Sequence, residues 1–458
     1  MRQLLLVFVI FILSILGLIA LFNTVTNTSK QSNIALVTQL PTYPQAAEHL
    51  TTALQWSSSN DSLGQLQLDS FYHWVQQTYP SLFDNPNVEW QEFGPSNWVA
   101  KWVGRKADLA PIVWMASPQV NIPTKAQQAA WSVSPFSGHL TSTHIYGQGS
   151  QGSKAAMIAM LEVLHAFVQK NRLPDRTIYL AFPFPAQVGE EQILQALAQA
   201  GTPAEYILQT GGLIAKDLLW ELPTPVALVG IGQMEQAQVK VVRKHPTMNW
   251  KVFLGRLQKA LPTADLEHET AQELLAQLSP ELSFKERFVF SNSWLLDWSQ
   301  QSYFCPSSLP HQLVGTSVQL SPALPDSDTA WLKVAAPLLE QASLSYIQEL
   351  LKTDSVIVVS NWKIQKGGAT AATESRSYRL LGNTCKEIFP NLMTAPIWVN
   401  RPQPLTFSTI QAPIFYFHPI IQDSNSWEKA KWGITERVSR QNYERLLQFY
   451  YQLLTNSI

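Results

Sequence analysis

The first feature along the chain is a long apolar segment near the N-terminus. Leu4–Phe22 is an unbroken run without a charged residue. As an α-helix it would span about 28 Å, which is enough to cross a bilayer. The stretch Ala20–Asn23 does not resemble the small-residue cleavage site of a secretory signal peptide. Because the run is apolar on all faces, the pattern predicts an uncleaved transmembrane helix through residues 4–22 rather than a buried core helix.

Charges on either side of this run predict its orientation. Arg2 and the terminal amino group precede it and Lys30 follows it, a slight bias that places the N-terminus in the cytoplasm. We therefore expect a signal anchor and a single-pass membrane protein. Its main domain would lie on the extracytoplasmic side, whether periplasmic, extracellular or lumenal. The polar segment Asn23–Gln39 suits a tether between the membrane and the folded body, and folding is expected to begin near Pro41.

Beyond the tether, helical and strand-like periodicities alternate. The predicted helices and strands up to the middle of the chain are two amphipathic helices within 46–83, strands at Trp98–Val103, Ala110–Ala116 and Thr177–Phe182, and a helix at Lys154–Gln169. The last of these helices has apolar residues three and four positions apart, so it buries one face. Such alternation of strand and helix predicts an α/β fold with a mostly parallel mixed sheet.

The periodicity changes in the middle of the chain and then returns to long helices. The predicted elements from there on are a strand at Gln238–Arg243, helices at Trp250–Ala260 and Thr329–Leu339, a strand at Ser355–Ser360, helices at Ser375–Ile388 and Ser439–Leu454, and a strand near Ala412–Phe417. We therefore expect an anchor and tether over 1–29 and an α/β domain in two segments, 30–235 and 366–458. A small antiparallel α+β domain over 236–365 would be inserted between them.

Composition narrows the function classes. A hydrophobic content of 46% with 14% charged residues describes a globular chain, and its 32 basic and 33 acidic residues form no long run of either sign. We therefore expect no nucleic-acid partner. The two cysteines, Cys305 and Cys385, provide neither a disulfide framework nor a cysteine-based metal motif.

A glycine-rich segment precedes the helix that begins near Lys154. Gly147–Gly152 fits the G-x-G-x-x-G dinucleotide fingerprint. A dinucleotide site also needs an acidic residue after the next strand, whereas Asp175 comes before it. A phosphate-binding loop would require the order of Ser153 and Lys154 to be reversed. The motif alone therefore gives little support to nucleotide binding.

The whole neighbourhood of this segment supports a different interpretation. The relevant residues are Pro111–Ala116, Trp131, Pro135–Gly138, Ile145–Gly147, Gly149, Lys154, Arg176–Phe182, Gly211–Gly212, Ile414–Ile420 and Asn442–Tyr443. Together they resemble the M20 family of zinc metallopeptidases, in particular its carboxypeptidase and N-acyl amino acid hydrolase branch. The resemblance covers nearly all of 46–454 but is faint over 255–339. It implies a phosphorylase/hydrolase-like α/β catalytic domain with an inserted lid domain, which mediates dimers in many relatives.

In that family, His, Asp and Glu residues hold two zinc ions, and a glutamate base activates the bridging water. The resemblance places the family's His-x-Asp on Ser117 and Gln119, and its bridging aspartate on Gly152. The resemblance also places the family's catalytic base on Ala186. It places the family's other zinc ligands on Gln187, Gln209 and Thr406.

None of these replacements supplies a carboxylate, imidazole or thiolate. Zinc binds neutral amide oxygens and un-ionised hydroxyls poorly, and two dications without a bridging carboxylate repel each other. Active relatives would require zinc, but for this chain the replacements predict no cofactor, no metal ligand and no catalytic residue in the family's positions. The chain would then be a pseudoenzyme with the metallopeptidase fold.

Three other residues are candidates for lining the former cleft: His245, Ser150 and Arg401. His245 lies near the position of a lid histidine that reaches the substrate carbonyl in active relatives, although an exposed structural role is the alternative. Ser150 is a candidate nucleophile, with His139 and His144 nearby in sequence, but it lacks a Gly-x-Ser-x-Gly context and would otherwise cap a turn. Arg401 is the nearest cation in sequence to the former site, unless it is simply solvated.

Two functions remain open at this point. The first is a non-catalytic binding or assembly protein whose cleft holds a peptide or N-acyl amino acid, and whose lid could form a homodimer. The alternative is a hydrolase that acts on peptides or N-acyl amino acids by residual or rewired chemistry.

Overall fold

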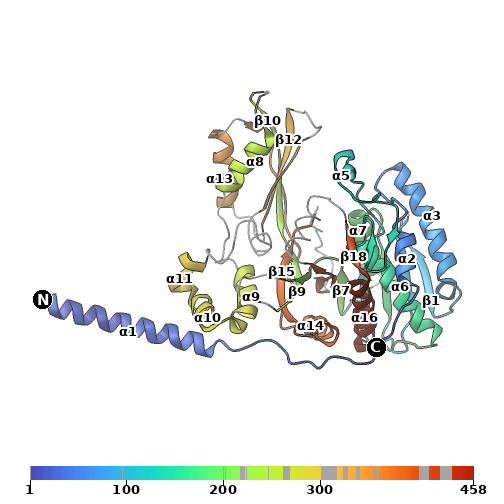
Figure 1. Ribbon diagram of the computed structural model, residues 1–458, viewed down its shortest axis with the longest axis horizontal. Helices are drawn as coiled ribbons and strands as arrows, with labels where there is room; N and C mark the ends of the chain where they lie inside the picture. Colours follow the sequence, from blue (N-terminus) through green and yellow to red (C-terminus); the bar gives the residue numbers. More distant parts are fainter. Residues whose placement is uncertain are drawn as a thin grey trace.

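The computed structural model describes residues 2–457 apart from 95, 200, 202, 217–221, 223, 246, 261–268, 301–316, 323–327, 337–340, 354–355, 359, 402–411 and 423–435. Helix α1 (Arg2–Thr26) projects from a folded body that contains a large sheet and a smaller one (Figure 1). It is apolar along its length and only 6% of its most apolar window is buried. By length and composition α1 can cross a membrane, in agreement with the predicted span.

The large sheet has ten strands and combines parallel and antiparallel pairs. Its strands are β1 (Val88–Glu92), β2 (Trp98–Trp102), β6 (Ile178–Phe182), β3 (Ile112–Met115), β7 (Tyr206–Gln209), β16 (Ile414–Tyr416), β9 (Val226–Gln233), β8 (Leu213–Ala215) and β17 (Ile421–Gln422) in spatial order, with β15 (Met393–Val399) beside β9. Adjacent strands β6, β3, β7 and β16 are parallel. The predicted α/β fold with a mixed sheet is therefore confirmed.

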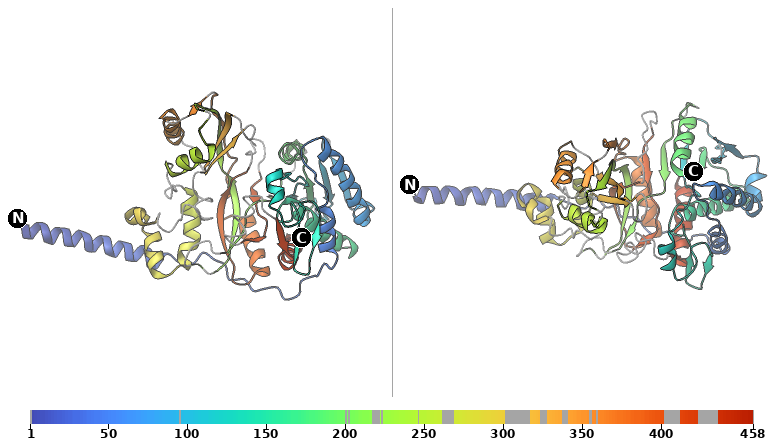
Figure 2. Two further views of the ribbon diagram at one scale, coloured as in Figure 1. Left: turned by 45° about the horizontal axis from the view of Figure 1, so that its top comes forward. Right: turned by 90° about the horizontal axis from the view of Figure 1, so that it is seen from above.

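Helices cover both faces of this sheet. The covering helices are α2 (Ala46–Ala53), α3 (Ser62–Thr78), α4 (Pro80–Phe83), α6 (Ser153–Gln169), α14 (Arg376–Ile388) and α16 (Arg440–Ser457) on one side, and α7 (Ala186–Gln199) on the other. Helix α6 is almost entirely buried because both the sheet and an outer layer of helices enclose it. Figure 2 shows the layers from two further directions. Helix α5 (Lys125–Ala129) and a small sheet of β18 (Arg437–Ser439), β5 (His144–Tyr146) and β4 (His139–Leu140) lie beside them.

A second sheet has its own apolar core. It consists of β11 (Ser317–Pro322), β12 (Thr329–Ala336), β10 (Glu235–Arg243), β13 (Val356–Val358) and β14 (Lys363–Gln365), with α8 (Trp250–Ala260) and α13 (Gln341–Thr353) packed against it. The expected helix at Thr329–Leu339 is wrong. Buried and half-buried side chains alternate along β12, which is the period of a strand with one face on a core.

The short helices between α8 and β11 do not belong to that second core. They are α9 (Glu269–Leu278), the 3₁₀ turn η1 (Ser279–Glu281), α10 (Phe284–Ser291) and α11 (Ser293–Gln300). Leu274 and Leu278 of α9 pack with Ala395 of β15 in the large sheet. The segment 236–365, expected as one inserted unit, thus contributes to two cores.

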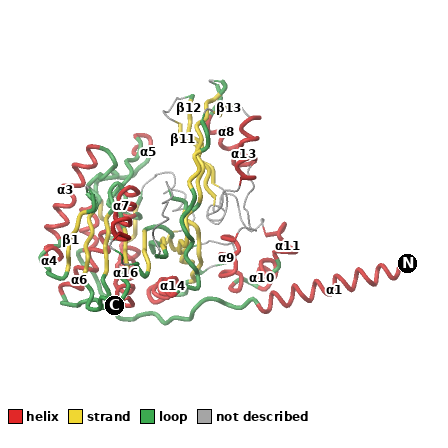
Figure 3. Tube along the Cα trace, turned by 180° about the vertical axis from the view of Figure 1, so that it is seen from behind, coloured by secondary structure: helices red, strands yellow, loops and turns green. Residues whose placement is uncertain are grey.

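The polar segment after α1 is attached to the body rather than free. The Gln31 side-chain oxygen accepts hydrogen bonds from the Thr394 amide at 2.9 Å and the Lys386 ammonium at 3.0 Å. The Val37 amide donates to the Glu387 carbonyl at 2.9 Å. This segment runs along the folded body (Figure 3). Side-chain and backbone hydrogen bonds therefore fix the path of this segment along the body.

Candidate functional site

The carboxyl ends of four parallel strands meet at one edge of the large sheet. β3 ends at Met115, β6 at Phe182, β7 at Gln209 and β16 at Tyr416. In open α/β sheets, ligands bind outside the carboxyl ends of the strands. Ser117 lies two residues after the end of β3 and α7 begins four residues after the end of β6, so the fold brings several sequence-predicted positions to this edge.

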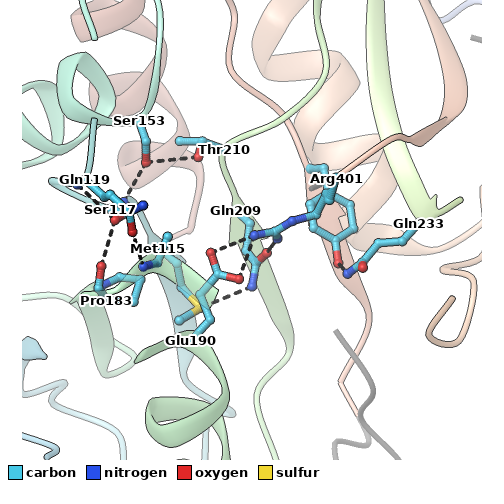
Figure 4. Close-up of polar contacts among 12 residues, drawn as sticks. Met115, Ser117, Gln119, Ser153, Pro183, Glu190, Gln209, Thr210, Gln233 and Arg401 are labelled. Carbon is cyan, nitrogen blue, oxygen red and sulfur yellow. Dashed lines mark hydrogen bonds and ion pairs between the residues drawn. The ribbon is translucent and has the colours of Figure 1, made fainter. Parts of the chain in front are cut away.

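Ser117 and Gln119 hold the loop after β3 by hydrogen bonds. The Ser117 hydroxyl donates to the Pro183 carbonyl at 2.7 Å, and the Ser117 amide donates to the Ser153 hydroxyl at 2.6 Å. The Gln119 side-chain oxygen accepts from the Ala186 amide at 2.7 Å. These side chains are used to join β3, β6 and the starts of α6 and α7 (Figure 4).

Gly152 is the residue that caps the N-terminus of α6. Its φ of −111° is open to any amino acid, and an added Cβ would meet nothing closer than 3.9 Å. Neither backbone conformation nor packing therefore requires glycine here. Gly212 differs, since its φ is +45° and a Cβ would lie 2.3 Å from the Leu228 carbonyl oxygen.

A buried ion pair occupies the centre of the site. Both oxygens of the Glu190 carboxylate accept from one amino group of Arg401, at 2.8 and 2.7 Å, and the side chains are only 8% and 17% exposed. The other amino group of Arg401 donates to the side-chain oxygen of Gln209. Gln209 itself lies buried at the end of β7, with its amide group 3.5 Å from the Met115 sulfur. Figure 4 shows the guanidinium between the two side chains.

The surroundings hold Arg401 in its charged form. Burial disfavours the guanidinium, but the Glu190 carboxylate and Tyr416 outweigh burial and raise the pKa of Arg401. Burial also raises the pKa of Glu190, which Arg401 only partly offsets. The Arg401 guanidinium lies 5.5 Å from the centre of the Tyr416 ring, a distance at which cation–π attraction contributes. The permanent positive charge of this site is therefore an arginine.

Polar contacts from β9 and β10 support this arrangement. Gln233 donates through its side-chain amide to the Tyr416 hydroxyl, and Gln236 donates to the backbone carbonyl of Arg401. The Gln236 amide also lies 3.2 Å from the Asn400 side-chain oxygen. Asn400 and Arg401 are thus fixed against the second sheet.

The glycine-rich loop before α6 binds a carboxylate of its own chain. The Glu436 side chain accepts from the Gly149 amide at 3.0 Å and the Gln151 amide at 2.7 Å. Burial raises the pKa of Glu436, and these two amide bonds oppose the shift. The backbone donors that a phosphate group would need are therefore already occupied, which removes the basis for the nucleotide interpretation.

The other candidate residues lie in different environments. Ser150 is fully buried, and its hydroxyl has no hydrogen-bond partner in the described part of the chain. Arg401 is not solvated but ion-paired. His245 is exposed beyond the end of β10, whose length of about 30 Å separates it from the Arg401 site. Gln187 lies on α7, but its side chain and all of Thr406 fall outside the described residues.

Sequence reasoning missed Glu190 and the environment of Lys154. Glu190 lies one helical turn after Ala186 on α7, so helical spacing was the available signal. Lys154 is fully buried, and its ammonium donates to the Trp56 carbonyl at 2.7 Å and lies 5.1 Å from the Phe71 ring centre. Burial lowers the pKa of Lys154 to about 7. Within the described residues, no group of three or more His, Cys, Asp or Glu could hold a metal ion.

Comparisons with solved structures define the class of fold. An M20 family metallo-carboxypeptidase from Sulfolobus solfataricus is similar with a TM-score of 0.58 and 12% identity over 90% of this chain and 99% of that one. Human carnosine dipeptidase 1 gives a TM-score of 0.58 and 12% identity over 90% of this chain and 97% of that one. The body therefore has the fold of these peptidases.

Sequence relatives extend the comparison along the chain. N-fatty-acyl-amino acid synthase/hydrolase PM20D1 of Xenopus tropicalis is 22% identical over 88% of this chain and 83% of its own length. Probable carboxypeptidase S-like 2 of Dictyostelium discoideum is 23% identical over 96% of this chain and 92% of its own. No family model matches the sequence. The sequence relatives support an M20 peptidase homologue, and the solved structures show that the body shares the fold of that family.

Proposed function

We propose that this chain is a membrane-anchored M20 peptidase homologue that works without zinc, as a non-catalytic binding or assembly protein. The observation that carries the proposal is the Arg401–Glu190 ion pair bonded to Gln209. A guanidinium cannot be deprotonated in proteins and excludes other cations from its immediate surroundings by charge repulsion. This guanidinium is bonded to Gln209, one of the positions that the family resemblance aligns with a zinc ligand.

The donor atoms near this pair do not fit zinc. The Ser117 hydroxyl donates to Pro183, the Gln119 oxygen accepts from Ala186, and the Gln209 oxygen accepts from Arg401. Gly152 has no side chain to offer. Zinc sites in proteins use thiolate, imidazole and carboxylate ligands, usually four around one ion. The side chains at these positions instead satisfy one another, which supports a structural role for them.

The contacts of the serines give no support to rewired hydrolysis. Ser117 and Ser153 bond to backbone or to other hydroxyls, and Ser153 accepts from the Thr210 hydroxyl at 3.1 Å. Buried Ser150 has no base within hydrogen-bond reach among the described residues. A serine nucleophile needs such a base, which the described contacts do not provide.

The fold supports the proposed binding role. The edge of the sheet keeps polar side chains and the family's two-sheet architecture, so a peptide or an N-acyl amino acid is the proposed ligand class. We propose that α1 spans the membrane with its N-terminus in the cytoplasm and the body outside, and that the second sheet provides a homodimer surface.

Metal analysis of the full chain in detergent tests the loss of zinc. After incubation with zinc and dialysis, we expect far less than one ion per chain, and no hydrolysis of a dipeptide or an N-acyl amino acid in added zinc. Two retained zinc ions with hydrolysis would overturn the proposal. Metal-free hydrolysis that Ser150→Ala abolishes would establish the alternative. Without hydrolysis, a rise in unfolding temperature with the N-acyl amino acid supports binding, and no rise with either compound contradicts it.

A further inference from the structure

The end of α1 is bonded to two short helices of the folded body. The Asn292 side-chain amide donates to the Ala20 carbonyl at 3.0 Å and to the Thr24 hydroxyl at 3.2 Å. Asn27 donates to the hydroxyls of Ser279 and Ser291, both at 2.8 Å. Ala20 and Thr24 are each only 1% exposed, although the rest of α1 is largely bare. Helix α10, its C-terminal capping residue Asn292 and the η1 turn therefore hold α1 in one place on the body.

These contacts lie at a defined depth along α1. The apolar run ends at Phe22, and the bonded residues Ala20 to Asn27 cover about 10 Å of helix. A bilayer has a hydrocarbon core of about 30 Å and polar headgroup layers of about 5–8 Å on each side. If the run fills the hydrocarbon core, the bonded turns and the α10–α11 pair lie in the headgroup layer. Figure 1 and Figure 3 show the pair beside the body end of α1.

The α10–α11 pair exposes large apolar side chains at that depth. Phe284 is 55% exposed, Trp294 53% and Leu295 40%. Exposed Lys285 adds a positive charge next to Phe284. Aromatic side chains concentrate at membrane–water interfaces, where the ring leaves water and its polar end stays solvated, and lysine attracts anionic headgroups. In water these side chains would remain solvated at a cost in free energy.

We propose that the α10–α11 pair is a membrane-contact surface, in which Phe284, Trp294 and Leu295 insert into the headgroup layer beside α1. The occupant of this surface is the lipid bilayer that α1 crosses, since α1 is bonded to α10 and to Asn292, and α11 packs against α10. The inference rests on the proposed membrane span of α1. The surface fixes the distance and tilt of the body relative to the membrane, because the segment after α1 is also bonded to the body.

Photolabelling tests this surface with the full chain. The protein is reconstituted in nanodiscs of phosphatidylcholine and phosphatidylglycerol that contain phosphatidylcholine with a diazirine in its acyl chain. After illumination, labelled peptides are identified by mass spectrometry. Helix α3 provides the matched control, since Leu63 and Leu66 are 75% and 65% exposed on another part of the body. We expect label in α1 and in residues 284–296, and only background label in α3.

Two double variants test whether these side chains insert into the bilayer or only lie near it. Phe284→Ser/Trp294→Ser should reduce labelling of residues 284–296 to the level of α3 while α1 stays labelled, whereas Leu63→Ser/Leu66→Ser should change nothing. Labelled α1 with residues 284–296 at background in the unaltered chain would overturn the membrane-contact surface and leave the anchor intact. Unlabelled α1 would overturn the anchor and the surface together.

Discussion

Replacing Arg401 with methionine removes the guanidinium but keeps much of the apolar stem. The Glu190 carboxylate, 8% exposed, would then be buried without its counter-ion. Breaking a buried pair in this way costs about 3–5 kcal/mol of unfolding free energy. The double variant Arg401→Met/Glu190→Leu removes both charges and should recover most of that loss, because apolar replacements of buried pairs are often neutral or stabilising.

The variant should also acquire a pH dependence. Burial already raises the pKa of Glu190, and loss of Arg401 removes the group that opposes the shift. A carboxyl whose pKa is higher in the folded than in the unfolded state destabilises the fold once it ionises. The destabilisation of Arg401→Met should therefore shrink as the pH falls from 8 towards 5, by at most about 1.4 kcal/mol per pH unit.

Urea unfolding of the full chain in detergent, followed by the fluorescence of its 16 tryptophans, measures both effects. The matched control is Lys101→Met, which breaks the more exposed pair with Glu89 at 2.8 Å and should cost about 1 kcal/mol or less. If Arg401→Met costs no more than Lys101→Met and shows no pH dependence, the site is not a desolvated ion pair and the argument for cation replacement fails.

Two further predictions concern α6. Burial lowers the pKa of Lys154 to about 7, so the unfolded chain binds more protons between pH 7 and 10, and the unaltered chain should gain up to about 1.4 kcal/mol of stability per pH unit there. Lys154→Met should abolish this gain in urea unfolding at pH 7 and 9; an equal gain in the variant would show that Lys154 is solvated. Gly152→Asp should fold with a stability within about 0.5 kcal/mol of the unaltered chain and bind no zinc. Gly212→Ala should lower the free energy of unfolding by roughly 1 kcal/mol or more, because its positive φ strains a residue that has a Cβ. Equal effects of Gly152→Asp and Gly212→Ala on the unfolding temperature would contradict this prediction.

Sequence patterns were sufficient where one periodicity dominates. The apolar run of α1, the buried strand β3 and the helix α6 carry signals that tertiary contacts do not alter. The resemblance to the M20 family placed Ser117 after a predicted strand, and β3 ends two residues before it. The strand β7, which ends at Gln209, was not expected from the sequence. The helix expected at Thr329–Leu339 is wrong. The side chains there suit either a helix or a strand, and pairing with β10 makes the segment the strand β12.

The sequence by itself determined the α/β class and the apolar helix, because each is set by a local pattern of apolar residues. Only the tertiary structure decided that Arg401 meets Glu190, since 211 residues separate them and no local pattern encodes a contact between a loop and a helix so far apart. The same holds for Glu436 on the glycine-rich loop and for Asn292 on α1. Each is a polar group whose burial is tolerable only with its distant partner, and the complete fold determines which partner that is.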